Sequence, residues 1–362
     1  MTKEKDNDSS LSVNEGVDQQ KSLNPRGLDR FKNRRSLLSL DEYVNGIKEG
    51  NRTILSRAIT LIESTKPEHR ELAQDIIEKC LPETGNSVRI GITGVPGVGK
   101  STFIETLGNY IIEKGNTLAV LAIDPSSTRT RGSILGDKTR METLANNEDA
   151  YIRPSPTAGS LGGVARKTRE TIYLCEAAGF DTIFIETVGV GQSETAVHSM
   201  VDFFLLLMLA GAGDELQGIK RGIMEMADTI AINKVDEAKP KTVKQAVREY
   251  KNALHLYPET ESGWSPKVTT CSALQEEGIA DIWNIIEEYI ELTKENGYFR
   301  DKRNRQAKHW MYDTITNRLT DHFFDSPAVR KEKEKIERKV LNGELTSFKA
   351  AHKLLDLYFD SL

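Results

Sequence analysis

The run from Gly94 to Ser101 has the spacing G-x-x-x-x-G-K-S, which is typical of a loop that binds nucleotide phosphates. Backbone N–H groups of such a loop surround the β-phosphate, while Lys100 is placed to reach the β- and γ-phosphate oxygens. The Ser101 hydroxyl is placed to hold Mg²⁺. The sequence therefore predicts a nucleoside triphosphate site with a metal ion, formed by Gly94, Gly97, Val98, Gly99, Lys100, Ser101 and Thr102.

A second motif, Asn233-Lys234-Val235-Asp236, predicts that the base is guanine. A carboxylate at Asp236 can accept hydrogen bonds from guanine N1–H and N2–H₂. Adenine lacks these donors and would leave a desolvated carboxylate unpaired, at a cost of several kcal/mol. Further along the chain, Ser272-Ala273-Leu274 is expected to aim the Ala273 N–H group at guanine O6. Alone, N-K-x-D also suits the capped start of a helix, but its order after the phosphate loop favours a nucleotide site.

Acidic residues between these two motifs are candidates for the metal site. Glu186 opens the E-x-x-G sequence that ends at Gly189, in which the acid helps to hold Mg²⁺ and the glycine N–H approaches the γ-phosphate. Asp124 and Asp137 can serve Mg²⁺ directly or through water, although aspartates also cap helices and form turns. The predicted metal residues are Ser101, Asp124, Asp137 and Glu186.

The residue directly after Gly189 is Val190, so the chain lacks a glutamine where Ras-type GTPases carry one. Gln192 or a carboxylate would then have to orient the attacking water. Positioning and charge neutralisation dominate phosphoryl transfer, so an incomplete site hydrolyses GTP slowly until a partner orders it. Slow hydrolysis suits a molecular switch.

The elements that must position these residues alternate between short apolar runs and helical patterns. Such alternation predicts an α/β fold, a P-loop NTPase with a mostly parallel sheet flanked by helices. Ligands bind at the carboxyl ends of such strands. Strands are expected at 88–93, 118–123, 182–187, 203–209, 228–233 and 267–271, and helices at 100–114, 163–178, 240–254 and 279–293.

Helical extensions are expected on both sides of this region. Residues 1–36 predict a disordered polar tail without a signal or transit peptide, and residues 37–85 an N-terminal helical segment whose first helix has a capping box at Ser39–Glu42. The GTPase domain is expected to span 86–296, followed by a C-terminal helical dimerisation arm at 297–362. In that arm Met311, Ile315, Leu319 and Phe323 share one helical face and Pro327 interrupts the helix.

The composition of the chain limits the classes of binding partner and the cellular compartment that we expect. The net charge of −5 argues against nucleic acid as the main partner. The longest apolar stretch, 203–212, is far short of the ~20 residues that span a bilayer, so no membrane partner is expected. Three scattered cysteines, Cys80, Cys175 and Cys271, are expected to be reduced core thiols of a cytoplasmic protein.

Five stretches together resemble the methylmalonyl-CoA mutase-associated GTPases: Gly94–Ser101, Asp124–Ser127, Gly136–Arg140, Glu186–Gln192 and Asn233–Asp236. These cobalamin-enzyme chaperones were once described as arginine/ornithine transport kinases, and the resemblance covers residues 40–355. It implies a Mg²⁺-dependent GTPase of the signal-recognition/MinD class that dimerises through its C-terminal arm. It also implies that the chain binds an adenosylcobalamin-dependent acyl-CoA mutase, gates cofactor delivery and protects or reactivates the enzyme. A cobalamin adenosyltransferase is a further implied partner.

The resemblance also assigns roles to individual residues. Asn233, Asp236 and Ala273 would recognise guanine, and Ala210–Lys220 matches a mobile segment of the family in which Lys220 completes the catalytic site when a partner binds. The catalytic candidates are Lys100, Glu186, Gln192 and Lys220. The nucleotide-binding candidates outside the phosphate loop are Gly189, Asn233, Lys234, Asp236, Ser272, Ala273 and Leu274.

Three other functions remain as alternatives. The older family name suggests a P-loop kinase or ATPase linked to amino-acid transport, against which N-K-x-D argues. A nickel-insertion GTPase would need a His-rich or Cys-rich tract, whereas the six histidines are dispersed. The third is a scaffold that binds GTP without hydrolysing it. Among mutases, methylmalonyl-CoA mutase is the first candidate and an isobutyryl-type mutase the second.

Overall fold

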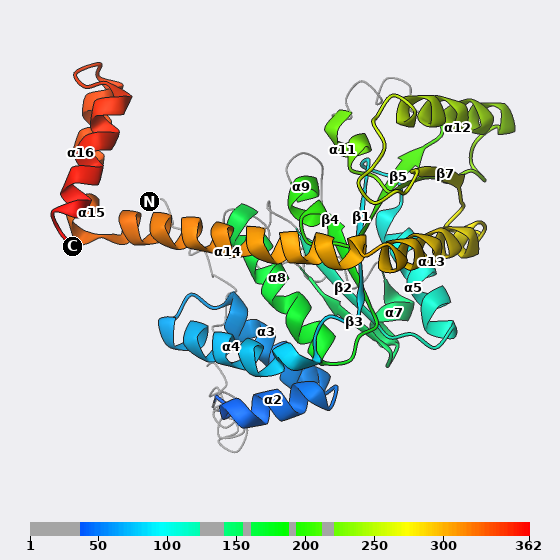
Figure 1. Cartoon of the computed structure of the whole chain (residues 1–362), viewed down its shortest axis with the longest axis horizontal. Helices are drawn as coiled ribbons and strands as arrows, with labels where there is room; N and C mark the ends of the chain where they lie inside the picture. The colour runs from blue at the N-terminus through cyan, green and yellow to red at the C-terminus, as the bar shows by residue number, and fades with distance from the viewer. Residues whose placement is uncertain (1–36, 124–140, 155–160, 188–192, 212–220) are drawn as a thin grey trace, which may run out of the picture.

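The computed structural model describes residues 37–123, 141–154, 161–187, 193–211 and 221–362. At its centre is a seven-stranded parallel sheet with the strand order β3-β2-β4-β1-β5-β6-β7 (Figure 1). This sheet, flanked by helices, confirms the predicted fold class. The strands are β1 (Val88–Gly94), β2 (Leu118–Ile123), β3 (Ala150–Arg153), β4 (Thr182–Thr187), β5 (Phe203–Leu209), β6 (Thr229–Asn233) and β7 (Lys267–Thr270).

Each face of the sheet has its own hydrophobic core because successive strand side chains point to opposite faces. In β4, for example, Phe184 belongs to one core and its neighbour Ile185 to the other. The first core includes residues of α5 (Lys100–Glu113), α7 (Glu142–Asn146), α11 (Arg221–Glu225), α12 (Pro240–Leu254) and α13 (Ile279–Glu295). The second includes residues of α8 (Leu161–Ala177), α9 (Ser193–His198) and the N-terminal helices.

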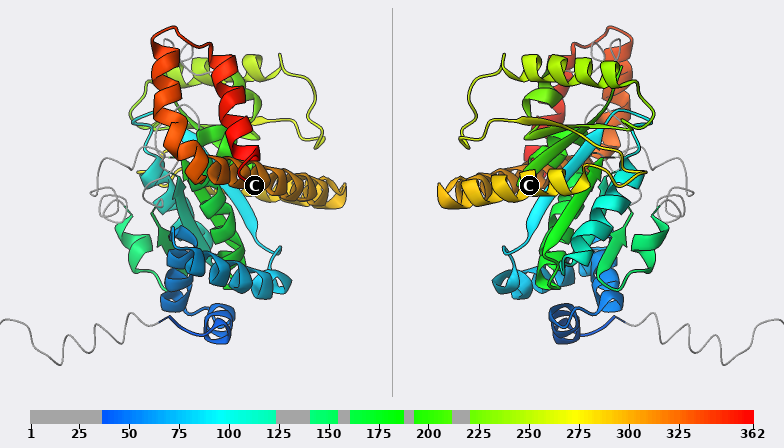
Figure 2. Two further views of the ribbon diagram at one scale, coloured as in Figure 1. Left: turned by 90° about the vertical axis from the view of Figure 1, so that its left-hand side faces the viewer. Right: turned by 90° about the vertical axis from the view of Figure 1, so that its right-hand side faces the viewer.

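The N-terminal helices α2 (Leu40–Lys48), α3 (Arg52–Glu63) and α4 (Pro67–Cys80) form an outer layer against α8, and the 3₁₀ turn Leu81–Glu83 leads from them to the sheet (Figures 1 and 2). The predicted capping box opens α2. Glu42 N–H donates to Ser39 Oγ at 3.3 Å, and Ser39 N–H donates to Glu42 Oε2 at 2.7 Å. These two bonds satisfy main-chain donors that the first turn of a helix leaves free.

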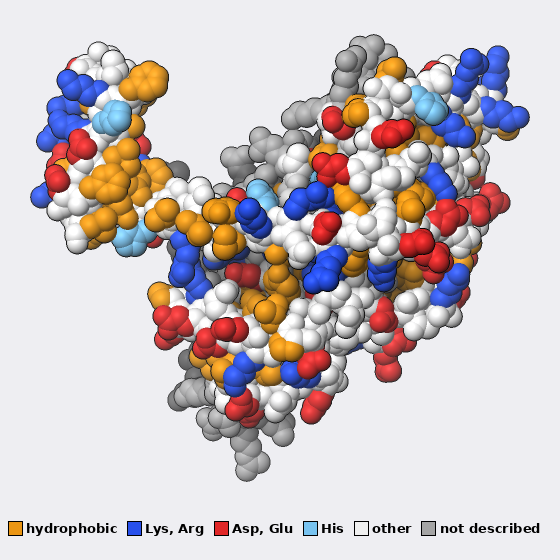
Figure 3. All heavy atoms as spheres, in the orientation of Figure 1, with side chains coloured by type: hydrophobic (Ala, Val, Ile, Leu, Met, Phe, Trp, Pro, Cys, Tyr) orange, Lys and Arg blue, Asp and Glu red, His pale blue; other side chains and the backbone are white. Residues whose placement is uncertain are grey.

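The C-terminal helices are α14 (Tyr298–Asp325), α15 (Pro327–Leu341) and α16 (Ser347–Phe359). The first half of α14 lies against the body, whereas its second half projects and carries the antiparallel pair α15 and α16 (Figure 1). Met311, Ile315 and Leu319 are 51%, 47% and 61% exposed, and Figure 3 shows apolar side chains gathered on this projection. Three residues of the predicted apolar face are therefore open to solvent, whereas the fourth, Phe323, is half-buried with its ring edge-on to Tyr358 of α16.

Four short elements were not predicted from the sequence: β3, α7, α9 and α11 have four to six residues each. Elements this short contain too few residues to display a hydrophobic period. The expected strands 228–233 and 267–271 are each one residue shorter, because β6 begins at Thr229 and β7 ends at Thr270. The expected helix 163–178 runs from Leu161 to Ala177.

The three cysteines are buried and unbridged, as predicted. Burial raises the pKa of the Cys271 thiol to about 12, which keeps it protonated and unreactive. Among the residues that the structure describes, no helix is both long and apolar enough to cross a membrane.

Candidate nucleotide site

The predicted motifs meet at the carboxyl edge of the sheet. The phosphate loop follows β1, Glu186 is the penultimate residue of β4, Asn233 is the last residue of β6, and Ser272–Leu274 come just after β7. Because all these strands are parallel, their carboxyl ends lie on one side of the molecule. The fold thus brings together residues that are up to 180 positions apart in the chain.

The phosphate loop depends on glycines at positions where a side chain would clash or strain the backbone. A Cβ atom on Gly94 would lie 2.5 Å from Leu207 O in the neighbouring strand. Gly97 and Gly99 have φ angles of 76° and 88°, which L-residues rarely adopt. Gly99 precedes α5 directly, so the loop leads into the helix N-terminus where an anion is favoured.

Lys100 lies across its own loop. Its ammonium group donates a hydrogen bond to Gly94 O at 2.9 Å. Burial lowers the pKa of Lys100, while the carboxylates of Glu186 and Glu194 act in the opposite direction. Two nearly inaccessible acids, 5% and 2% exposed, therefore lie close enough to influence this lysine. Glu194, in the first turn of α9, was not predicted, because no motif in the sequence singles it out.

A buried pair of hydroxyl groups joins β1, which leads into the phosphate loop, to β4, which carries Glu186. Thr93 Oγ1 and Thr187 Oγ1 are 2.7 Å apart, between the carboxyl ends of β1 and β4. Both side chains are almost fully buried. The contact fixes Glu186 relative to the start of the phosphate loop, and neither threonine was predicted to take part.

Asn233 connects the phosphate loop to the predicted base-binding loop. Its Nδ2 group donates to Val98 O at 2.8 Å, and its Oδ1 atom accepts from Ala273 N–H at 3.0 Å and from Cys271 Sγ at 3.4 Å. From α5, Thr106 Oγ1 donates to Ala273 O at 2.9 Å. Because Ala273 N–H is bonded to Asn233 here, its role toward guanine O6 stays a prediction.

The other predicted base-binding residues differ in exposure. Asp236 is exposed, and the Leu274 side chain is 70% exposed beyond the end of β7. Lys234 has a φ of 60° and forms an ion pair with Glu237 at 3.5 Å. Ser272 is buried, and its Oγ atom accepts from Gln275 N–H at 3.2 Å. Asp236 and Leu274 are therefore open to a ligand, while Ser272 shapes the loop.

The donor atoms at this edge suit a hard cation. Ser101 is half-buried in the first turn of α5, and Glu186 is at the end of β4, so both offer oxygen ligands. Mg²⁺ keeps several waters and needs only one or two protein ligands besides phosphate oxygens. No cluster of three or more His, Cys, Asp or Glu that could hold a metal occurs in the described ranges. Of the predicted site residues, Asp124, Asp137, Gly189, Gln192 and Lys220 lie outside those ranges.

A family model described as methylmalonyl Co-A mutase-associated GTPase MeaB matches residues 55–328. The chain belongs to the MeaB family. A probable GTPase of Mycobacterium bovis is 51% identical over 319 residues, which are 88% of this chain and 95% of that protein. The mouse protein named methylmalonic aciduria type A homolog, mitochondrial, is 46% identical and is aligned over 88% of this chain and 79% of its own. The crystal structure of a LAO/AO transport system kinase has a TM-score of 0.71 at 36% identity and covers 89% of this chain and 99% of its own.

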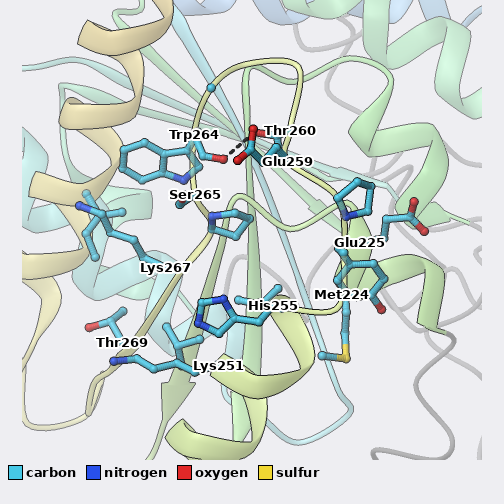
Figure 4. Close-up of a pocket in the computed structure, with 17 residues that line it drawn as sticks. Met224, Glu225, Lys251, His255, Glu259, Thr260, Trp264, Ser265, Lys267 and Thr269 are labelled. Atoms are coloured by element: carbon cyan, nitrogen blue, oxygen red, sulfur yellow. Dashed lines mark hydrogen bonds between the residues drawn. The ribbon is translucent and has the colours of Figure 1, made fainter.

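Membership of the MeaB family confirms the resemblance drawn from the motifs. The chain is a P-loop GTPase that binds guanine nucleotides and hydrolyses GTP. A cavity of about 1050 Å³ lies away from the nucleotide motifs, between the end of α12, β7 and the loop 255–266 (Figure 4). His255, Trp264 and Lys267 line it, and none of the predicted nucleotide residues is among its lining residues.

Proposed function

We propose that the carboxyl edge of the sheet is the Mg²⁺-dependent GTP site of this MeaB-family chain. The observation that carries the proposal is the Asn233 side chain, which joins the phosphate loop at Val98 to the base-binding loop at Ala273. One side chain thereby sets the separation between the predicted phosphate and base subsites. A nucleotide that spans both subsites has to match that separation.

In this proposal Lys100 exchanges its hydrogen bond with Gly94 O for the β- and γ-phosphate oxygens. Ser101, Asp124, Asp137 and Glu186 would hold Mg²⁺, which would neutralise phosphate charge. The N–H of Gly189 would approach the γ-phosphate, as the E-x-x-G motif predicts. The Thr93–Thr187 contact supports the assignment of Glu186, because it ties the end of β4, where Glu186 lies, to the end of β1, where the phosphate loop begins.

For the base, we propose that Asp236 pairs with guanine N1–H and N2–H₂, with Asn233 and Ala273 along the opposite edge. Lys234 and Leu274 would flank the ring, and Ser272 would support the turn. The exposure of Asp236 and Leu274 supports these roles, because both can contact a ligand without prior rearrangement of the core.

We further propose that the chain is a chaperone of an adenosylcobalamin-dependent acyl-CoA mutase, methylmalonyl-CoA mutase first, and that it gates cofactor delivery and protects or reactivates that enzyme. The family description and the name of the mouse relative support this partner. Val190 supports it as well, since a site without a Ras-type glutamine is incomplete until a partner orders it. Gln192 or a carboxylate would orient the water, and Lys220 would approach the developing phosphate charge when the partner binds. A cobalamin adenosyltransferase would be a further partner, in the cytoplasm.

We propose that residues 297–362 form a dimerisation arm. The exposed apolar face at Met311, Ile315 and Leu319 supports it, because a soluble monomer rarely leaves such a continuous stripe uncovered.

The test of the mutase proposal is GTP hydrolysis with and without the mutase. We expect at least a ten-fold increase in rate, which requires only ~1.4 kcal/mol of barrier lowering. Lys220→Ala should abolish most of the increase and leave basal turnover intact, whereas Lys66→Ala, at an exposed remote lysine, should behave as the parent. A mutase complex with an unchanged hydrolysis rate would contradict the proposal.

A further inference from the structure

The buried face of α14 is polar, which is unusual for a helix that packs on a protein body. Lys302, Gln306 and Trp310 are spaced four residues apart and are only 9%, 7% and 8% exposed. Lysine and glutamine are seldom buried to this degree unless their polar groups have specific partners. We call these three residues the α14 ladder.

The partners of the α14 ladder belong to a single turn, residues 199–202, between α9 and β5. Three main-chain carbonyls of this turn accept from the ladder: Ser199 O from Trp310 Nε1 at 3.0 Å, Val201 O from Gln306 Nε2 at 2.8 Å, and Asp202 O from Lys302 Nζ at 2.7 Å. Arg303 adds two bonds to the Asp202 carboxylate, at 2.8 and 2.7 Å. The helix α14 therefore binds the turn 199–202 both at three main-chain carbonyls and at the Asp202 side chain.

The same turn is the end of a short, rigid connection to the phosphate loop. It directly follows α9, which has six residues and is about 9 Å long. The other end of α9 carries Glu194, which is 2% exposed and whose charge acts to raise the pKa of Lys100. Between these ends α9 packs tightly on β1, since a Cβ atom on Gly91 would lie 2.8 Å from Val197 Cγ1. A close-packed segment of this kind transmits displacement because it has little room to deform.

One polar atom of the α14 ladder is left without a hydrogen bond where α14 packs on the body. Gln306 Oε1 is buried and has no hydrogen-bond partner within the described part of the chain. An unpaired buried carbonyl oxygen is costly, so this position of α14 against the turn leaves one polar group of the ladder unsatisfied. Beyond the ladder, α14 continues into the projection that carries α15 and α16 (Figure 1).

We propose that the α14 ladder positions the GTPase site from a distance. Through the turn 199–202 and α9 it sets the position of β1, on which α9 packs at Gly91 and which ends at Gly94 of the phosphate loop. Nucleotide binding therefore moves α14, and a partner that moves the projection alters hydrolysis. Coupling between two binding events is reciprocal by thermodynamic necessity. The inference rests on the proposed placement of phosphate at Lys100, and the experiments below separate failure of that placement from failure of the coupling.

The first experiment is ¹⁹F NMR of the full chain labelled with 5-fluorotryptophan. The chain has three tryptophans, and Trp264 and Trp283 belong to the core on the other face of the sheet, so they serve as internal controls. A non-hydrolysable GTP analogue with Mg²⁺ should shift the Trp310 resonance at least three times as far as that of Trp283. An unmoved Trp310 resonance at saturating nucleotide would overturn the coupling.

The second experiment breaks the ladder with Gln306→Met, which removes the donor to Val201 O and keeps a similar volume. The matched control is Lys308→Met, on the exposed side of the same helix. We expect kcat for GTP to fall at least three-fold with KM within two-fold of the parent, and the Trp310 response to be halved. A variant that loses thermal stability but keeps kcat and the Trp310 response would show that the ladder is only structural.

A third variant, Lys100→Ala, separates the two failures. It should bind fluorescent GDP much more weakly than the parent. Binding as tight as that of the parent would refute the phosphate placement itself, whatever the behaviour of Trp310.

Discussion

Replacement of Asn233 by alanine removes the hydrogen bonds that connect the phosphate loop to the predicted base-binding loop. The side chain is 1% exposed, and its loss leaves Val98 O and Ala273 N–H without their partners in a buried region. Each unsatisfied buried group costs ~1–3 kcal/mol. Because water that enters the space left by the side chain offsets part of this cost, we expect a total loss of about 2–4 kcal/mol in the free energy of unfolding.

Urea unfolding followed by circular dichroism measures this loss as a lower midpoint at an unchanged slope. Titration with fluorescent GDP measures the second consequence, weaker binding, because the two loops are no longer held at a fixed separation. Asn252→Ala, at an exposed asparagine of α12, is the control and should change neither quantity. A loss below about 0.5 kcal/mol together with parental GDP affinity would refute the reasoning.

Two further predictions concern the metal site and the pH dependence. Glu186→Ala should lower kcat for GTP at least ten-fold and change the Kd for GDP less than three-fold, because its carboxylate serves the metal shell; parental turnover would exclude that role. Burial, and secondly the charge of Lys302, lowers the pKa of His198 to about 4. Since an unfolded histidine titrates near 6.5, unfolding binds a proton between pH 6.5 and 4, and the folded state loses up to about 3 kcal/mol as the pH falls through this window. Urea unfolding of His198→Gln should not show this loss of stability at low pH. Burial raises the pKa of Asp228 to about 6, which stabilises the folded state as the pH falls. Because the parent and the variant both contain Asp228, its contribution cancels when their stabilities are subtracted.

The sheet could be predicted because its strands are continuous apolar runs that end in turn residues. Phe203–Leu209, for instance, is buried in the middle of the sheet and admits few other interpretations. The phosphate loop and N-K-x-D could be predicted because their chemistry requires fixed residue types at short spacing. Motif spacing could not predict which residues from distant parts of the chain contact one another. The Asn233–Val98 bond joins residues 135 positions apart, and only the parallel strand order brings them together.

The α14 ladder escaped prediction for a related reason. Lys302 and Gln306 are polar and suggest a solvent-exposed face, whereas the apolar residues at Met311, Ile315 and Leu319 suggest a buried one. The structure has the reverse arrangement, because the polar residues meet main-chain carbonyls of the turn 199–202 and the apolar stripe faces solvent. Hydrophobic pattern alone cannot reveal a face that is buried through hydrogen bonds.

The most direct test of the account is a competition experiment at the nucleotide site. Fluorescent GDP bound to the full chain is displaced by GTP or by ATP in the presence of Mg²⁺. If Asp236 recognises guanine, GTP should displace the label at a concentration at least ~100-fold lower than ATP, and Asp236→Asn should shift the preference toward xanthosine nucleotides, whose C2 carbonyl can accept from the new amide. Displacement by ATP and GTP at equal concentrations would contradict the assignment of this edge of the sheet as a guanine nucleotide site.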